Sequence, residues 1–252
     1  MGMFGRFPMR QLARKIGWRL YMWGENIGDA DMATNGEAWL IRSLPAPVGR
    51  FVFFDVGANV GKYTSAVLAR FPDAEGHLFD PQPACAATLR EAFAPHEGIR
   101  VNEAACSDEA GRRSMWLDAP QDSMASLHRH SGHGASELEI ETIVLERYIE
   151  ELGVGHIHLL KVDVEGHELE ALTGMGGYLG PSFVDLIQFE YAGIGADSPT
   201  SLRSLWQLLE ARGFVLCKLM PRGLWRRVYY PAMDNFQYAN YVAVSPAVIG
   251  RL

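Results

Sequence analysis

Short apolar segments alternate with amphipathic segments along the chain from residue 50 onward. The apolar segments have the length of buried strands, and several segments between them carry apolar residues at helical spacing. Strands are expected at residues 51–56, 76–79, 99–105, 113–117, 141–145, 157–162, 185–189, 214–219 and 236–244. Helices are expected between them, one ending at Arg70 and others at 84–93, 168–172 and 201–212. This alternation predicts an α/β fold with a mostly parallel sheet that is covered on both faces.

The last two predicted strands differ from the others. No helical pattern separates 214–219 from 236–244, whereas a parallel crossover usually contains a helix. We therefore expect an antiparallel pair at that edge of the sheet. Residues 113–117 and 141–145 are expected to form additional strands around a polar loop, which leaves seven strands for the main sheet.

A basic amphipathic helix is predicted for residues 6–24. Its apolar side chains recur on one face, at Met9, Leu12, Ile16, Leu20 and Trp23. Its charged side chains are all basic: Arg6, Arg10, Arg14, Lys15 and Arg19. Such a helix either docks its apolar face on the main domain or makes a peripheral contact with an anionic membrane. The docked arrangement is the favoured prediction.

A second, shorter helix is predicted from about Thr34 to Leu44. Thr34 and Glu37 have the spacing of a capping box, in which side chains satisfy backbone N–H groups of the first turn. Two prolines follow directly and cannot continue a helix. They divide the chain into an N-terminal helical segment, 1–48, and a main domain, 49–252.

Composition narrows the classes of function and location. The formal net charge of −7 over 252 residues argues against general nucleic-acid binding, which needs a basic surface. The three cysteines are odd in number and have no metal-ligand spacing, which favours buried thiols in a reducing compartment. The sequence contains no run of about eighteen apolar residues and no apolar secretion signal. A cytoplasmic location is expected.

The turn after the first predicted strand has the pattern of a ligand site. An apolar strand runs into Asp55, and a turn containing Gly57 and Gly61 leads into a helix. Glycines let the backbone approach a ligand closely, and the helix N-terminus adds unpaired N–H groups. The dinucleotide pattern is incomplete, because Asn59 replaces its second glycine. A nucleoside without phosphates is therefore favoured, and Asp55 can pair with an ammonium group on it.

A second acidic residue, Asp80, ends the next predicted strand, nineteen residues after Gly61. A carboxylate at this position can accept hydrogen bonds from both hydroxyls of a ribose. The alternative is that Asp80 caps the following helix. Together with the glycine turn, the position favours a nucleoside cofactor.

Ionisable residues gather at the end of a predicted central strand. Four of them fall within six positions: Asp163, Glu165, His167 and Glu168. Ligands of open α/β sheets bind outside these strand ends, and clustered charges are costly there unless they have a function. The acidic residues can also stabilise the first turn of a helix, although this does not account for Asp163. Glu190 ends the next strand and is expected near Asp163.

Four segments, in this order, resemble the FkbM-type methyltransferases: FFDVGANVGKYT, LFDPQP, LLKVDVEGHELEALTG and LIQFEYAG. The resemblance covers about residues 35–244, and its most specific part is KVDVEGHELE. It implies a Rossmann-like class I methyltransferase fold with S-adenosylmethionine as the methyl donor. It also implies O-methylation of hydroxyls on sugars or on natural products such as macrolides. Asp80 stands where the family more often has glutamate.

The resemblance further implies which residues form the site. At the cofactor it places Asp55, Gly57, Asn59, Gly61 and Asp80. Beside the methyl group it places Asp163, Glu165, Gly166 and His167. The residues alone leave the base open: His167 suits the task by its ordinary pKa, and Asp163 is the alternative. Asp163 and Glu190 can instead hold a divalent metal such as Mg²⁺.

The acceptor is expected to be a small molecule or a glycan. O-methylation of a saccharide or glycosylated metabolite is favoured, and a polyketide or peptide hydroxyl is the alternative. A nucleotide-binding dehydrogenase is disfavoured by the incomplete glycine pattern, and a non-catalytic binding module by the intact acidic cluster. The sequence does not determine the oligomeric state.

A polar loop carries three histidines, His128, His130 and His133. They supply enough imidazoles for a zinc site. A solvated loop that closes over substrate is the favoured interpretation of this segment.

Overall fold

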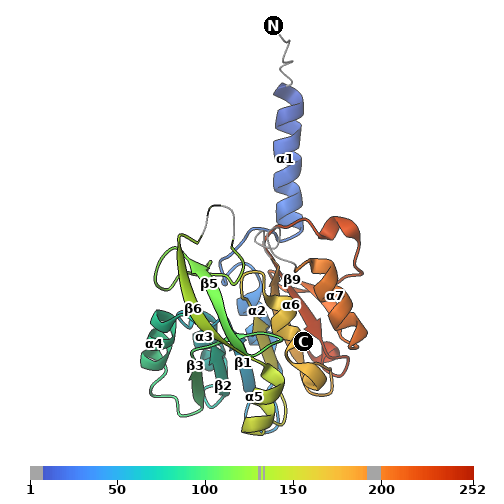
Figure 1. Ribbon diagram of the computed structural model, residues 1–252. Helices are drawn as coiled ribbons and strands as arrows, with labels where there is room; N and C mark the ends of the chain where they lie inside the picture. The colour runs from blue at the N-terminus through green and yellow to red at the C-terminus, as the bar shows by residue number, and fades with distance from the viewer. Residues whose placement is uncertain (1–7, 130–131, 133, 192–199) are drawn as a thin grey trace.

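The computed structural model describes residues 8–129, 132, 134–191 and 200–252 (Figure 1). Its α-helices are α1 (Pro8–Gly24), α2 (Glu37–Ser43), α3 (Lys62–Arg70), α4 (Pro83–Ala92), α5 (Leu145–Leu152), α6 (Glu168–Thr173) and α7 (Leu202–Ala211). Short 3-10 turns lie at Gly176–Tyr178, Pro231–Met233 and Ile249–Arg251.

The main sheet contains β1 (Val52–Val56), β2 (Glu75–Phe79), β3 (Ile99–Asn102), β7 (Leu159–Val162), β8 (Leu186–Tyr191), β9 (Val215–Met220), β10 (Gly223–Arg226) and β11 (Ala239–Val244). The order across the sheet is β10-β9-β11-β8-β7-β1-β2-β3. β1 pairs in parallel with both β2 and β7, and β7 with β8. This arrangement confirms the predicted Rossmann-like α/β fold.

The edge of the main sheet differs from the prediction in two details. β11 is antiparallel, as predicted, but it inserts between β8 and β9 instead of lying at the edge. All six of its residues are buried, so the central position removes more apolar surface from water than an edge would. β10 forms a hairpin with β9 and adds an eighth strand within a segment that was predicted to be a connection.

A second, smaller sheet contains β4 (Ala105–Cys106), β5 (Gly111–Leu117) and β6 (Ser136–Ile143), in the order β4-β6-β5. β5 confirms the additional strand predicted at 113–117. β6 begins and ends earlier than predicted, because α5 starts at Leu145 and buries Leu145 and Ile149 in the core.

Both faces of the main sheet are buried, as expected for parallel strands between two layers of helices. Alternate side chains of β1 enter opposite layers. Phe54 packs in the layer that contains residues of α5, α6 and α7, and Phe53 in the layer that contains residues of α2, α3 and α4. The three cysteines are free and buried, which confirms their interpretation as small core side chains.

The predicted basic helix is present, but its apolar face is open to solvent. α1 stands away from the α/β body (Figure 1), which contradicts the docked arrangement. The exposed apolar side chains are Met9, Leu12, Ile16, Leu20 and Trp23. The end of the helix is anchored, because Met22 packs against the core and Glu25 pairs with Lys218 at 3.1 Å. Arg6 lies outside the described residues. Within the described residues, no helix is both long and apolar enough to cross a membrane.

The second helix begins later than predicted. Gly36, with a φ of 107°, is the N-cap of α2, and no side chain caps it. The Thr34–Glu37 capping box is therefore not formed. The carboxylate of Glu37 instead accepts hydrogen bonds from Asn35 Nδ2 at 2.9 Å and Gln188 Nε2 at 2.6 Å.

At the carboxyl ends of β1 and β7 the backbones approach so closely that only glycine fits at position 57. Its φ is 84°, and a Cβ atom there would lie 1.8 Å from the backbone oxygen of Asp163. We expect Gly57→Ala to lower the free energy of unfolding by about 2–5 kcal/mol, from left-handed backbone strain plus overpacking. Urea denaturation measures the change.

Gly153 provides the matched control for this substitution. It has a φ of 64°, but a Cβ atom there would meet no atom within 4 Å. Gly153→Ala should therefore lower the free energy of unfolding only by the cost of the left-handed backbone conformation, about 1 kcal/mol. Equal losses in the two variants would show that the contact with Asp163 is not the constraint.

Candidate active site

Two adjoining cavities open at the carboxyl ends of β1, β2 and β7, on either side of the turn that follows β1. They share five lining residues: Gly57, Asn59, Ser123, Asp163 and Glu165. The chain runs from β1 to β2 and β3 on one side and continues to β7 and β8 on the other. Ligands of open α/β sheets bind at this kind of topological switch point.

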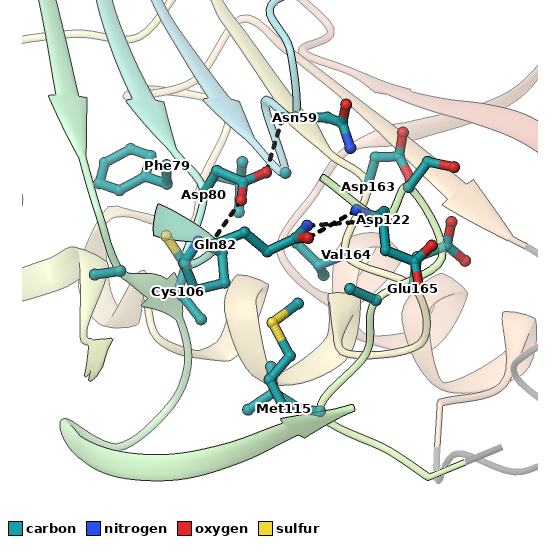
Figure 2. Close-up of a pocket in the computed structure, with 18 residues that line it drawn as sticks. Asn59, Phe79, Asp80, Gln82, Cys106, Met115, Asp122, Asp163, Val164 and Glu165 are labelled. Carbon is teal, nitrogen blue, oxygen red and sulfur yellow. Dashed lines mark hydrogen bonds between the residues drawn. The ribbon is translucent and has the colours of Figure 1, made fainter. Parts of the chain in front are cut away.

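The first cavity combines apolar walls with several carboxylates, among them Asp80. Phe79, Met115 and Leu127 supply apolar surface, and Asp80 lies at the end of β2 (Figure 2). This composition suits an adenosine group, whose base needs flat apolar contact and whose ribose needs an acceptor. The side chain of Gln82 exchanges two hydrogen bonds with the backbone of Asp122, both 2.9 Å long, and so fixes one wall.

Asp80 joins the two turns that border the first cavity. Figure 2 shows its carboxylate between Asn59 and Gln82, whose backbone N–H groups donate to Oδ2 at 2.8 Å and Oδ1 at 3.0 Å. Burial raises the pKa of Asp80, although these N–H groups oppose the change. Asp80 does not cap α4, because the N-cap of that helix is Gln82. The carboxylate keeps free lone pairs for a ribose.

Two of the residues predicted at the cofactor lie outside the described lining of both cavities. Asp55 is fully buried: its Oδ2 accepts a hydrogen bond from Thr64, and its Oδ1 lies 3.5 Å from the Lys161 ammonium. Asp55 is therefore placed to support the strand end rather than to pair with a ligand. Gly61 is the N-cap of α3, and a Cβ atom there would meet the Phe93 ring at 2.5 Å. Its role is packing.

The second cavity contains the three carboxylates that the sequence placed at two strand ends: Asp163, Glu165 and Glu190. Their oxygens lie within 4.8 Å of one another. Lys161 lies beneath them, with its Nζ 3.0 Å from Asp163 Oδ2. Burial, followed by the charges of Asp163 and Glu168, raises the pKa of Glu165 to about 9. Burial and the charges of Asp163 and Glu165 raise the pKa of Glu190 well above its ordinary value.

The turn that presents Glu165 is strained and well supported. Glu165 has a φ of 53°, a left-handed conformation that costs a residue with a side chain about 1–2 kcal/mol. Glu168 Oε1 accepts the backbone N–H groups of Val164 and Gly166, both at 3.1 Å, and holds the turn in place. Strain of this kind tends to occur at functional sites. Glu168 thus supports the turn before α6, a role that differs from the expected stabilisation of the first turn of the helix.

His167 lies away from both cavities. Its side chain is only 1% exposed, and its ring contacts Ser107, His128 and Glu170. Burial, with a contribution from His128, lowers the pKa of His167 to about 4. Its position therefore gives no support to the expectation that it is the base beside the methyl group.

Several polar residues that form the second cavity were not predicted from the sequence. Glu37, Tyr63, Lys161 and Tyr238 line it, and Gln188 connects two of them. Tyr63 donates to Gln188 Oε1 at 2.7 Å, and Gln188 Nε2 donates to Glu37. The available signal was the presence of Lys161 and Gln188 inside otherwise apolar strands, where an unpaired polar side chain is costly.

The sequence matches one known family. The model of the methyltransferase FkbM domain family aligns with residues 55–216, which is more than half of the chain. The chain belongs to the FkbM methyltransferase family. The match confirms the expected family and identifies an S-adenosylmethionine-dependent methyltransferase domain.

Individual proteins similar to this FkbM-family chain share a third or less of the aligned residues with it. The 31-O-demethyl-FK506 methyltransferase FkbM of Streptomyces tacrolimicus is 33% identical over 49% of this chain and 59% of its own length. The 2-O-methyltransferase NoeI of Sinorhizobium fredii is 27% identical over 68% of this chain and 75% of its own length. Among solved structures, an rRNA methylase from Streptococcus thermophilus aligns with a TM-score of 0.47 and 9% identity, over 86% of this chain and 99% of that one. The chain thus spans little more than half of the Streptomyces relative.

A change at Asp80 tests the assignment of the first cavity. Asp80→Ala should weaken S-adenosylhomocysteine binding about tenfold to a hundredfold, because it removes the ribose acceptor and leaves the Asn59 N–H unpaired. Calorimetry on the folded variant measures the affinity. Asp80→Asn keeps the shape of the side chain and one acceptor oxygen, so its affinity for S-adenosylhomocysteine should lie between those of the wild type and Asp80→Ala. Unchanged affinity in both would reduce Asp80 to a structural link between turns.

The raised pKa of Glu165 predicts how stability depends on pH. This carboxyl has a pKa of about 9 in the folded protein against an ordinary value of 4.5, so the folded state binds more protons between these values. Stability must then fall as pH rises from about 4.5 to about 9. Glu165→Gln should flatten that part of the profile in thermal unfolding. Glu139→Gln, at an exposed carboxylate paired with Arg112, is the control, and identical profiles in all three proteins would contradict the assignment.

Proposed function

We propose that this protein transfers a methyl group from S-adenosylmethionine to a hydroxyl oxygen of a saccharide or a glycosylated metabolite. The observation that carries the proposal is the cluster of Asp163, Glu165 and Glu190 in a cavity that adjoins the adenosine-shaped one. Carboxylates accept hydrogen bonds from hydroxyl groups, and several of them converging on one cavity suit an acceptor with several hydroxyls. The two relatives, FkbM and NoeI, are both O-methyltransferases, which supports an oxygen acceptor.

The residues of the cluster suggest a division of roles. When bound, S-adenosylmethionine supplies a methyl group that is activated by its sulfonium. Asp163 and Glu165 line both cavities and so lie where an acceptor would meet the cofactor. We assign Glu165 as the base that takes the hydroxyl proton, because a carboxyl with a pKa of about 9 is a stronger base than an exposed one. Asp163, paired with Lys161, orients the acceptor, and alignment supplies much of the rate.

Turnover of the variants tests these roles. Glu165→Gln and Asp163→Asn keep the shape of each side chain and should lower turnover by about a hundredfold or more, the usual effect of losing a positioned base or charge. The wild-type rate should rise with pH toward about 9, and Glu165→Gln should lose this rise. Glu139→Gln is the control for an unrelated carboxylate. A panel of sugar nucleotides, glycosides and polyketide or peptide alcohols must first identify the acceptor.

A chelator in the same assay tests the predicted magnesium site. Asp163 and Glu190 have the oxygen ligands that Mg²⁺ prefers, but Lys161 already places a positive charge beside Asp163. Loss of turnover on chelation and recovery with Mg²⁺ would show that a metal ion neutralises the carboxylates of the cluster. Full turnover after chelation would show that Lys161 is sufficient to neutralise them. Full turnover of both Glu165→Gln and Asp163→Asn, on a confirmed acceptor, would contradict the assigned roles.

We also propose that α1 makes a peripheral contact with an anionic membrane. Its apolar face is exposed, with Met9 at 84% and Trp23 at 82% exposure. Its charged side chains, Arg10, Arg14, Lys15 and Arg19, are all basic. Pairing with a second α1 would bring these like charges together, whereas anionic headgroups neutralise them while the apolar face enters the interface.

Sedimentation with vesicles tests this contact. The full chain should bind phosphatidylserine-containing vesicles at low salt, and the bound fraction should fall as salt rises. The double variant Arg14→Glu, Arg19→Glu and the single variant Trp23→Ala should each bind less, and Arg147→Glu on α5 is the control. Absence of binding at low salt, or self-association through α1 without vesicle binding, would contradict the proposal.

A further inference from the structure

The ring of His167 lies in a polar cluster that the proposed methyl transfer does not use. His167 Nδ1 lies 3.4 Å from His128 Nε2 and 3.6 Å from Glu170 Oε2, and the ligand atoms of all three residues lie within 4.8 Å of one another. His128 comes from the loop after β5, whereas His167 and Glu170 lie at the start of α6. The cluster therefore joins two segments that are far apart in the sequence.

The contacts of Ser107 favour one tautomer of His167. The hydroxyl of Ser107 donates its single proton to Asp108 Oδ1 at 3.1 Å. The same hydroxyl lies 3.0 Å from His167 Nε2, and with its proton directed at Asp108 it accepts the hydrogen of the Nε2–H tautomer. The lone pair of Nδ1 then points toward Glu170 Oε2, which is also an electron-rich atom. His128 Nε2 can donate to Nδ1 at 3.4 Å, and Thr200 donates to Glu170 Oε2 at 3.5 Å; a cation coordinated by Nδ1, His128 Nε2 and Glu170 Oε2 would instead satisfy all three atoms at once.

The spacing of the cluster matches one coordination geometry. Tetrahedral zinc with bonds of about 2.1 Å separates neighbouring ligand atoms by about 3.4 Å, whereas octahedral magnesium with bonds of about 2.1 Å separates them by about 3.0 Å. The observed 3.4 Å and 3.6 Å fit the first. Two imidazoles and one carboxylate are also a ligand set that zinc accepts.

We propose that His128, His167 and Glu170 form a binding site for a zinc ion that clamps the loop after β5 to the start of α6. Residues of that loop, Ser123, Ala125 and Leu127, line the first cavity. Ser126 already connects the loop to the opposite turn, because its hydroxyl donates to the backbone oxygen of Glu165 at 2.6 Å. A zinc ion would add a second and stronger connection two residues further on, and so hold that wall of the cavity.

The surroundings are consistent with a bound cation. Arg113 is the nearby positive charge, and its guanidinium is paired with Asp108 at 3.6 Å and Glu109 at 3.7 Å. A second group of potential ligands, His156, His158 and Asp185, is less suitable. There, His158 Nδ1 already accepts the backbone N–H of Val52 at 3.0 Å.

Titration of the chelator-treated full chain with Zn²⁺ tests the proposal, and it does so independently of the methyl acceptor. Calorimetry should find one tight zinc site per chain, and Co²⁺ should give the intense visible absorption of tetrahedral coordination. His128→Ala and Glu170→Gln, at partly exposed positions chosen because they spare the buried His167, should each weaken zinc binding at least tenfold. His156→Ala and Asp163→Asn are matched controls at the other two clusters and should bind zinc as the wild type does.

Linkage to the cofactor provides a second readout. Zinc should tighten S-adenosylhomocysteine binding severalfold in the wild type and not in His128→Ala, because zinc would hold the loop that lines the first cavity; the ligand should then tighten zinc binding by the same factor. Absence of zinc binding by the wild type would overturn the proposal. Zinc binding that survives in both His128→Ala and Glu170→Gln, or that is lost in a control variant, would overturn it as well.

Discussion

The geometry of the site depends on one buried ammonium group. Lys161 Nζ lies between Asp163 Oδ2 at 3.0 Å, Asp55 Oδ1 at 3.5 Å and the backbone oxygen of Gly57 at 3.4 Å. Burial alone lowers the pKa of a lysine, but the charges of Asp163 and Asp55 outweigh it and raise the pKa well above its ordinary value. The ammonium therefore stays charged and ties the end of β1 to the end of β7. Without it, the fully buried carboxylate of Asp55 would keep only its hydrogen bond from Thr64, and an unpaired buried charge is strongly destabilising.

This charge balance explains why the carboxylates beyond Lys161 behave differently from one another. Asp163 touches the ammonium directly, whereas Glu165 and Glu190 are further from it and close to other acids. Their pKa values are raised by burial first and by neighbouring acids second. A cavity that contains both an ion-paired carboxylate and carboxyls with raised pKa values can orient a hydroxyl with the first and, once one of the others has lost its own proton, accept the hydroxyl proton with that residue.

Much of the fold could be predicted from the sequence, because buried parallel strands give continuous apolar runs and the helices between them are amphipathic. β1, β2 and α7 appear within one or two residues of their expected bounds. β10 was not predicted, because four residues, Gly223–Arg226, carry too little pattern to distinguish a strand from a loop. The exposure of α1 was not predicted either, since an apolar stripe indicates that a face is buried without indicating what buries it.

The site residues that directly follow a strand could be predicted from the sequence. Those whose orientation depends on contacts between distant segments could not. Asp80 and the 163–165 turn follow strands directly, so their positions come from the order of the sheet. Asp55 was expected to contact the ligand. The direction in which a side chain points at a strand end depends on its partners, here Lys161, and the sequence does not show that Lys161 is close to Asp55. His167 lies two residues beyond Glu165, and the left-handed φ of Glu165 turns the chain and sends the histidine to the opposite side.

The two cavities are built from different parts of the chain, and this limits where specificity can arise. Every residue that lines the first cavity falls within the family match at 55–216. The second cavity takes part of its wall from outside that range, from Ala30, Met32, Glu37 and Tyr238. Substitutions at these positions would change the wall of the second cavity without altering any residue that lines the first. Glu37 differs from the other three, because its hydrogen bond to Gln188 connects the wall of the second cavity to β8, so a change at Glu37 also removes a partner from a buried side chain of the sheet.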